Sequence, residues 1–350
     1  MTTPTPLVTV LITTYNYGRF IEQAIDSVLS QDYPLDKVQI LVVDDGSTDD
    51  TAERVKKYGS RIDYFQKPNG GQASALNLGI EKSQGEIVML LDADDVFLPG
   101  KLARVADAFC HDPAPGMVYH PYTDWDERTN ERRDQLWPLI SGDARKQPRQ
   151  FFQFTPQPTS CIAFRRSDLA PLLPIPQHIL MLADCFLVYL VPLLSPVVAL
   201  PERLILHRIH GTNYFCVDEK QAGVETQRRK LHEWQIVYDA MRRWLESNGY
   251  TRKDFIVRRY RDVWYLAEQT ISFSIKPPGR LQFFWYELRQ NHSQSPIQSW
   301  RLTTFKYLFA FFALGLGYKR AERFYDWRAR VFGGLERAIR FLAPLRRNSI

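Results

Sequence analysis

The 350-residue sequence lacks several features that define common protein classes. Its four cysteines lie far apart and form no Cys-x-x-Cys pair, which argues against a zinc ribbon and against a secreted disulfide framework. No basic stretch followed by an apolar segment stands at the N-terminus, so no secretory signal is expected. The apolar run 307–317 has only 11 residues, whereas a membrane-spanning helix needs ~20. These absences predict a cytoplasmic protein without transmembrane segments.

Hydrophobic residues make up 45% and charged residues 24%, which excludes a disordered or fibrous chain. The formal net charge of +6 is unevenly distributed. Residues 301–350 hold 11 Lys/Arg against 3 Asp/Glu, so the first 300 residues carry a slight negative excess. The basic end could face nucleic acid, an anionic membrane surface or an acidic partner. The rest of the chain shows no charge pattern for a polyanion, and no nucleic-acid partner is expected.

Apolar runs alternate between strand and helix patterns in the N-terminal third. The spacing predicts strands at 7–13, 38–47, 63–66 and 86–91, and helices at 19–31, 51–58 and 73–83. This alternation is typical of βαβ units with a mostly parallel sheet. Further along, the pattern predicts strands at 117–120, 161–166 and 201–211, an apolar helix at 179–194, and helices from about residue 224 onward.

Three polar clusters follow predicted strands, at residues 13–16, 44–47 and 92–95. The carboxyl ends of parallel strands meet at one edge of the sheet, where ligands of such sheets bind. The clusters therefore predict a single site.

The cluster Asp92-Ala93-Asp94 places two carboxylates on one side of the chain, because strand side chains repeat every two residues. Mg²⁺ and Mn²⁺ prefer such oxygens and are often shared with a diphosphate, whose charge they neutralise. The alternative is an ordinary Asp-rich turn.

Asp44 and Asp45 are adjacent acids after an apolar run, which is costly unless their charge is balanced. One carboxylate could hold the N–H of a base or a ribose hydroxyl. The alternative is a strand-end turn in which an Asp caps the next helix.

Four linked segments carry a family resemblance: VTVLITTYNYGRFIEQAIDSVLSQDYP, VQILVVDDGSTDDT, NGGQASALNLGI and GEIVMLLDADDVFLPGKL. In order and spacing they resemble family 2 glycosyltransferases of the GT-A fold, closely over residues 7–102 and loosely to about 215. The resemblance implies an α/β, Rossmann-like sandwich with a mostly parallel central sheet and a helical C-terminal extension. We expect a nucleotide-sugar-binding and catalytic domain at 1–222 and a helical, basic region at 223–350.

The resemblance also assigns roles to individual residues. It implies Asp184 as the catalytic base, and Asp94 with His210 as ligands of a divalent metal, Mn²⁺ or Mg²⁺. The residues that would bind the nucleotide sugar are Thr13, Tyr15, Asn16, Asp44, Asp45, Asn69, Gly71, Asp92, Ala93 and Arg208. The sequence departs from the family at Leu76, where an Arg is common and a phosphate contact is in doubt, and at Ala183, which replaces an acid.

Two of these residues have a second interpretation. A lone Asp184 on an apolar helix should have a pKa raised by desolvation, as suits a general base. The alternative is an acid of the first helical turn, held by backbone N–H groups. His210 could complete the metal shell or be a structural histidine.

The implied reaction is a single displacement with inversion, in which an acceptor hydroxyl attacks the anomeric carbon of the donor. A UDP-sugar is the expected donor, with GDP and dTDP open. The expected acceptor is a glycan or lipid-linked hydroxyl in cell-surface polysaccharide or glycolipid synthesis. A catalytically degenerate scaffold is the alternative, supported by Leu76 and Ala183. A nucleotidyltransferase would need an N-terminal Gly-rich phosphate loop, and a processive synthase a Gln-x-x-Arg-Trp motif, and both are lacking.

The C-terminal residues 324–345 have apolar positions at helical spacing with arginines around them. Such a helix suits the membrane interface, which would place the protein peripherally on the inner face of the membrane. Alternatively, its apolar face packs on protein.

Overall fold

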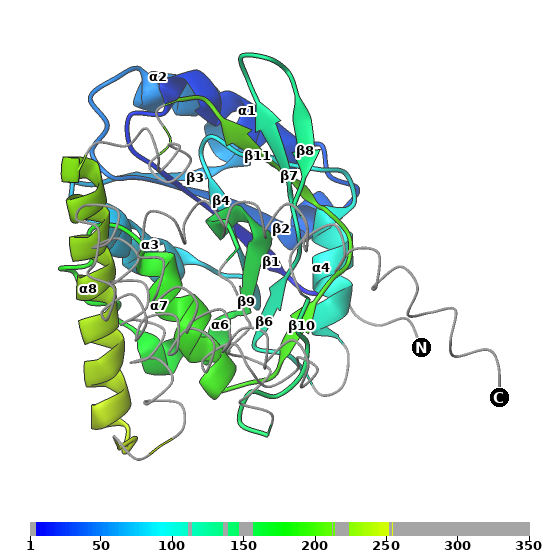
Figure 1. The fold of residues 1–350 in the computed structure, drawn as a ribbon. Coiled ribbons are helices and arrows are strands. Elements are labelled where there is room, and N and C mark those ends of the chain that lie inside the picture. Colours follow the sequence, from blue (N-terminus) through cyan, green and yellow to red (C-terminus); the bar gives the residue numbers. More distant parts are fainter. Residues whose placement is uncertain are drawn as a thin grey trace, which may run out of the picture. The chain divides into compact units, whose positions relative to one another are not determined.

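The computed structural model describes residues 5–110, 114–135, 139–146, 157–211, 213, 224–251 and 254. The chain forms two compact units, Met1–Val257 and Arg258–Ile350, and all described residues belong to the first. The fold of that first unit is shown in Figure 1.

A seven-stranded sheet forms the centre, in the order β10-β6-β9-β4-β1-β2-β3. The four strands of its N-terminal half run parallel, as predicted, while β9 is antiparallel to both of its neighbours. The strands are β1 (Val8–Thr14), β2 (Val38–Asp44), β3 (Asp63–Gln66), β4 (Ile87–Asp92), β6 (Met117–Tyr119), β9 (Ile162–Arg165) and β10 (Val197–Ala199). The side chains of β1 and β4 are almost all buried, because helices cover both faces of the sheet. The predicted α/β class with a mostly parallel sheet is confirmed.

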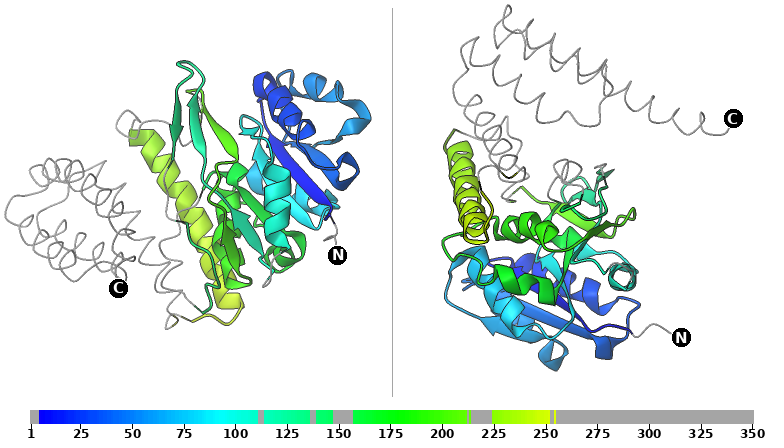
Figure 2. Two further views of the ribbon diagram at one scale, coloured as in Figure 1. Left: turned by 90° about the vertical axis from the view of Figure 1, so that its right-hand side faces the viewer. Right: turned by 90° about the horizontal axis from the view of Figure 1, so that it is seen from below.

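The helices of the N-terminal half pack on this sheet through their apolar faces (Figure 2). They are α1 (Gly18–Leu29), α2 (Thr51–Lys56), α3 (Gly71–Lys82) and α4 (Lys101–Phe109). In α1, the buried positions Phe20, Ile21, Ala24, Ile25 and Val28 follow helical spacing. The strand order reverses between β1 and β4, so right-handed crossovers place α3 on the opposite face from α1 and α2. The reversal marks the point where α/β sheets bind ligands.

A second sheet of four strands has the order β5-β11-β7-β8. It comprises β5 (Val96–Phe97), β7 (Thr123–Asp126), β8 (Arg132–Asp134) and β11 (Ile205–Ile209). The last of these was predicted, whereas β5, β7 and β8 were not, and neither was β10. These strands have two to four residues, and β8 is fully exposed, so no apolar alternation marks them.

The predicted apolar helix at 179–194 is shorter than expected. The helix α7 covers Ala183–Leu190 and is followed by a 3₁₀ turn at Val191–Leu193. Leu182 has a φ of 63°, and the carbonyl of Leu180 accepts a bond from Gln72 N, so the preceding backbone cannot continue the helix. The prediction overlooked this tertiary contact, because the residues before Ala183 are as apolar as those after it.

The helix α8 (Val224–Ser247) begins the helical region that the sequence predicts after residue 222. It packs beside α7, and Trp244 Nε1 donates to the carbonyl of Pro171 at 3.1 Å. No helix in the described ranges is long and apolar enough to cross a membrane. The apolar run 307–317 and the basic helix predicted at 324–345 lie outside the described residues, and the domain division at 222 stays a prediction.

Candidate active site

The carboxyl ends of β1, β2 and β4 lie side by side, as the polar clusters predict. Thr13 of β1 is in register with Asp92 of β4, and Thr14 is in register with Asp44 of β2. The loops that follow these strands therefore open at the same edge of the sheet.

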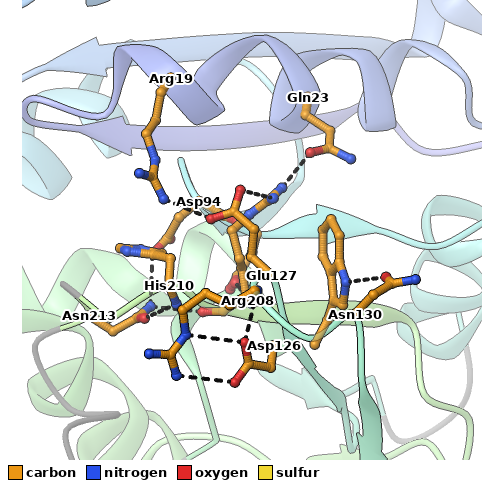
Figure 3. A network of polar contacts seen from close by, with 12 residues as sticks. Arg19, Gln23, Asp94, Asp126, Glu127, Asn130, Arg208, His210 and Asn213 are labelled. Carbon is orange, nitrogen blue, oxygen red and sulfur yellow. Dashed lines mark hydrogen bonds and ion pairs between the residues drawn. The ribbon is translucent and has the colours of Figure 1, made fainter.

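Asp94 follows β4 and meets the end of β11 (Figure 3). Its Oδ2 atom lies 3.0 Å from Nε2 of His210 and 3.3 Å from Nδ2 of Asn213. The His210 side chain is fully buried, with its ring 4.6 Å from that of Phe20. Asn213 accepts from His210 N through Oδ1 and donates to Arg208 O through Nδ2. The two residues predicted as metal ligands are thus neighbours in a rigid setting.

Arg208 packs against the turn that carries Asp94, and only 3% of its side chain is exposed. Its Nε donates to the carbonyl of Asp94 at 2.7 Å, and Nη1 is 3.3 Å from Oε1 of Glu127. Nη2 donates to Gln23 of α1, and the guanidinium lies 4.3 Å from the Trp125 ring centroid (Figure 3). The nucleotide-sugar contact implied for Arg208 stays a prediction, since its described contacts are to protein groups.

Asp95 fixes the same turn from inside, a role the sequence reasoning missed. Its carboxylate accepts from Ser160 Oγ at 2.6 Å and from Arg208 N at 2.9 Å. Burial raises the pKa of Asp95 to about 6, although nearby His207 opposes the shift. A third acid directly after a buried strand was the available signal.

Lys101 is a second buried group that the sequence reasoning missed. Its ammonium donates to the carbonyl of Ser160 at 2.7 Å and lies 2.6 Å from Nε2 of His120. Ser160 Oγ in turn accepts from Asp92 N at 3.0 Å. The lysine therefore supports the backbone on which the Asp92–Asp95 turn rests.

Asp92 and Asp184 lie near one another at Thr159. Burial raises the pKa of Asp92 well above its usual range, and the charges of Asp94, Asp95 and Asp184 raise it further, while a bond from Thr159 lowers it. Thr159 Oγ1 also donates to Oδ2 of Asp184 at 3.1 Å. Asp92 and Asp184 thus share one hydroxyl partner.

Asp184 itself shows features of both interpretations given above. Burial raises its pKa, as desolvation predicts, while bonds from Thr159 and the backbone N–H of Cys185 lower it. Its place in the first turn of α7 accounts for the backbone contact. The catalytic role of Asp184 stays a prediction.

Asp44 and Asp45 both hold protein donors at the end of β2. Asp44 is fully buried and accepts from Ser47 N and from Tyr64 Oη, each at 2.7 Å. Asp45 accepts from Lys67 Nζ at 2.5 Å. Asp44 therefore closes the strand-end turn, while Asp45 faces the next loop.

The loop Asn69–Gly71 is held by Asp45, which accepts from Gly70 N at 3.0 Å and from Gly71 N at 2.7 Å. Gly71 has a φ of +81°, and a Cβ there would come 2.8 Å from Cα of Leu180. Only glycine fits this close approach. Asn69 is exposed and Gly71 is half-buried, and their assignment to donor binding stays a prediction.

The loop after β1 carries the other residues assigned to the donor. Asn16 is in the left-handed region with φ 57°, and its Oδ1 accepts from Thr48 N at 2.7 Å, which joins the loops after β1 and β2. Tyr15 is 46% exposed and Thr13 is half-buried. Ala93 is buried, which leaves only its backbone for a ligand. Tyr15 is the large apolar surface that the loop offers to a ligand.

Leu76 is buried within α3, so that position supplies no charge to the site. The phosphate contact that the sequence put in doubt at this position therefore has no cationic side chain here.

The arrangement fits a divalent metal that is shared with a ligand. The described residues contain no group of three or more His, Cys, Asp or Glu that could hold a metal ion by themselves. An octahedral Mg²⁺ uses bonds of about 2.1 Å, so neighbouring ligands lie about 3 Å apart, and one or two carboxylates plus phosphate oxygens suffice. The 3.0 Å separation of Asp94 and His210 matches that spacing. Repulsion among Asp92, Asp94 and Asp95 would also be relieved by a cation.

Comparisons with known proteins agree with this architecture. The family model described as "Glycosyl transferase family 2" matches residues 9–173. An uncharacterized glycosyltransferase of Nostoc sp. is 31% identical over 289 residues, covering 76% of this chain and 88% of the relative. One of Mycoplasma pneumoniae is 42% identical over 119 residues, covering 32% of this chain and 40% of the relative.

Two solved structures share the fold. The mannosyltransferase PcManGT from Pyrobaculum calidifontis, solved with GDP-Man and Mn²⁺, aligns with a TM-score of 0.52 and 19% identity, covering 93% of this chain and 85% of the other. S. aureus TarS, residues 1–349, aligns with a TM-score of 0.50 and 17% identity, covering 87% and 89%. The fold is thus that of GT-A glycosyltransferases, and the chain belongs to glycosyltransferase family 2.

Proposed function

We propose that this glycosyltransferase moves a single sugar, with inversion, from a nucleoside-diphosphate sugar to an acceptor hydroxyl. The observation that carries the proposal is the meeting of Asp92, Asp94 and Asp184 at one sheet edge. Asp94 lies beside His210, and Asp184 lies beside Asp92 through Thr159. These contacts support a diphosphate site with the base beside it.

Asp184 is the proposed base. Its raised pKa brings it closer to the range in which a carboxylate can accept a proton and still be ionised at neutral pH. The acceptor hydroxyl loses its proton to Asp184 and forms a new bond to the anomeric carbon. The bond from that carbon to the diphosphate oxygen breaks, and the leaving group departs as the nucleoside diphosphate.

Asp94 and His210 are the proposed metal ligands, and the diphosphate would complete the coordination shell. A divalent cation, Mn²⁺ or Mg²⁺, supplies charge stabilisation for the leaving diphosphate when bound. Arg208, Asn213 and Asp95 hold the turn that presents Asp94. Because these contacts are already formed, little reorganisation is needed when the donor binds.

UDP is the proposed donor nucleotide, with exposed Tyr15 as a surface for the base. PcManGT was solved with GDP-Man and Mn²⁺, so GDP-sugars form the second group to test. The proposed acceptor is a glycan or lipid-linked hydroxyl in cell-surface polysaccharide or glycolipid synthesis. The positive charge of residues 301–350 supports a peripheral contact with an anionic membrane surface.

The test is release of nucleoside diphosphate from a panel of UDP- and GDP-sugars with Mn²⁺. We expect one donor to be hydrolysed slowly in water and turned over faster with an acceptor. Asp184→Asn should reduce turnover by about 100-fold or more, since general-base contributions are of that order. Nucleotide binding without turnover by the wild-type protein would instead favour a degenerate, sugar-binding member.

A further inference from the structure

The helix that carries Asp184 has no capping side chain of its own. The residue before its first turn is Leu182, which is in the left-handed region and whose side chain has no acceptor atom, although its carbonyl accepts from Cys185 N at 3.1 Å. The first N–H groups of a helix have no partner within it, and a buried one is costly. Ala183 is buried, so its N–H needs an acceptor from another segment.

Gln72 supplies that acceptor from the loop side of the site. Its Oε1 accepts from Ala183 N at 2.8 Å. The backbone N–H of Gln72 donates to the carbonyl of Leu180 at 2.9 Å, so the same residue bonds to the chain before and after Leu182. Gln72 therefore caps α7 in place of the missing local cap.

Gln72 also continues the loop that Asp45 holds. Gly70 N and Gly71 N both donate to Asp45, and Gly71 packs closely on Leu180. A continuous path of short contacts thus runs from Asp45, through Gly71 and Gln72, to the residue that precedes Asp184. The path joins the C-terminal end of β2 to the N-terminal end of α7, and these are more than 130 residues apart in the sequence.

We propose that Gln72 is a positioning residue that couples the order of the Asn69–Gly71 loop to the placement of Asp184. This inference rests on the proposed function, in which the loop lies over the donor and Asp184 is the base. A donor that orders the loop also fixes Gln72, and Gln72 then holds the first turn of α7. Asp184 would thus be held more firmly when the donor is in place.

Gln72 lies in the first turn of α3, and a second residue of α3 offers a matched control. Asn77 of α3 donates to the carbonyl of Ile175 and accepts from Ile175 N, both at 2.8 Å. This clamp also joins α3 to the segment before α7, but it does not touch the first turn of α7. Asn77→Leu therefore removes a comparable polar clamp without removing the cap.

Hydrogen exchange on the full chain tests the cap directly. In Gln72→Met, which keeps the side-chain length but lacks the acceptor, the segment 181–190 should exchange about fivefold faster or more, as loss of a cap implies. Gln72→Glu, which keeps an acceptor oxygen, should restore slow exchange, and Asn77→Leu should leave this segment unchanged. Equal exchange in Gln72→Met and the wild-type protein would overturn the proposal, whether or not a nucleotide binds.

UDP with Mn²⁺ tests the coupling. In the wild-type protein, the ligand should slow exchange in both 67–75 and 181–190, whereas in Gln72→Met it should slow only 67–75. Equal slowing of 181–190 in the two proteins would contradict the coupling. If UDP slows neither segment in the wild-type protein, the comparison is repeated with GDP. If GDP also slows neither segment, the donor-binding function and the coupling both fail, while the cap is still decided by the first comparison.

Once a donor is known, the kinetics give a further readout. Gln72→Met should lower kcat by about tenfold, because misplacement of a catalytic group costs rate rather than affinity. Its KM for the donor should stay within about threefold of the wild-type value, and Gln72→Glu should recover most of kcat. A rise in KM with unchanged kcat would show that Gln72 acts only on donor binding.

Discussion

Nε2 of His210 lies 3.0 Å from Oδ2 of Asp94, although the two residues are separated by 116 positions in the chain. His210 follows the last strand of the second sheet, and Asp94 follows β4 of the central sheet. The residues that follow β11 thus lie against the turn at residues 92–95. This contact supports the proposal that His210 is a metal ligand and not only a packing residue.

Replacement of His210 should weaken the binding of metal in the presence of nucleotide. We expect His210→Ala to raise the Mn²⁺ dissociation constant about tenfold or more, measured by calorimetry with UDP or GDP present. The exposed His178, which contacts Arg243, provides the control, and His178→Ala should leave Mn²⁺ binding unchanged. An unchanged constant in His210→Ala would assign this residue to packing alone.

Arg208 should be important for stability as well as for the site. Arg208→Met leaves Glu127, Gln23 and the Asp94 carbonyl without their common donor, so we expect a loss of about 2 kcal/mol in the free energy of unfolding. Urea denaturation measures this loss. Arg128→Met removes an exposed pair with Asp126 and should cost less than about 0.5 kcal/mol. Equal losses in the two variants would show that the buried network adds little.

Buried Lys101 should make stability depend on pH. Burial lowers its pKa from 10.5 to about 7, although the charge of Asp95 opposes the shift. Below pH 7, both the folded and unfolded states hold the proton, and the cost of the buried charge is fully present. Above pH 7, the unfolded state binds more protons, so the free energy of unfolding should rise with pH. From pH 7 to 8 this contribution is about 1 kcal/mol.

Urea denaturation at pH 7 and 8 measures this rise. Burial raises the pKa of the Cys161 and Cys185 thiols, so these groups oppose the rise only as the pH approaches the pKa of an unfolded thiol, about 8.5, above this window. Lys101→Met should reduce the difference in the free energy of unfolding between pH 7 and pH 8 by about 1 kcal/mol. Lys37 is exposed, and Lys37→Met should keep the wild-type difference. A wild-type slope in Lys101→Met would mean that Lys101 stays charged in the folded protein.

Much of the sheet edge that is proposed to bind the donor was predictable, because long apolar strands end in polar residues there. The register of β1 with β2 and β4 confirms that the clusters at 13–16, 44–47 and 92–95 share one edge. Asp184 was recognisable as an acid in an apolar helix, and the direction of its pKa shift agrees with the prediction.

The unpredicted features depend on contacts between distant segments. Nothing local distinguishes Gln72 as the cap of α7, since its partner lies 111 residues away. The late start of α7 at Ala183, directly after Leu182, has the same cause. The strands β7 and β8 are short and polar, and the contacts of Arg208 with Glu127 and Trp125 also join distant segments.

Thr159 should tune the pH dependence of catalysis. Its hydroxyl donates to Asp184 and thereby favours the ionised carboxylate, which lowers the pKa that burial has raised. Thr159→Val should raise the pKa of Asp184 further, so the fall in turnover on acidification should begin at higher pH. Initial rates between pH 5 and 8 measure the shift. The matched variant Thr123→Val, whose hydroxyl bonds Asp134 on the second sheet, should keep the wild-type profile.

The central claim is that Asp94 holds a metal shared with a nucleoside diphosphate, and thermal unfolding tests it most directly. The protein is heated with UDP, GDP, dTDP or CMP, each with Mn²⁺ or with EDTA, beside Asp94→Asn. A ligand at 100 times its dissociation constant stabilises the folded state by ~2.7 kcal/mol, which is readily seen. We predict that one diphosphate raises the melting temperature only with Mn²⁺, and that Asp94→Asn abolishes the rise. Equal stabilisation in EDTA, or in Asp94→Asn, would contradict the account.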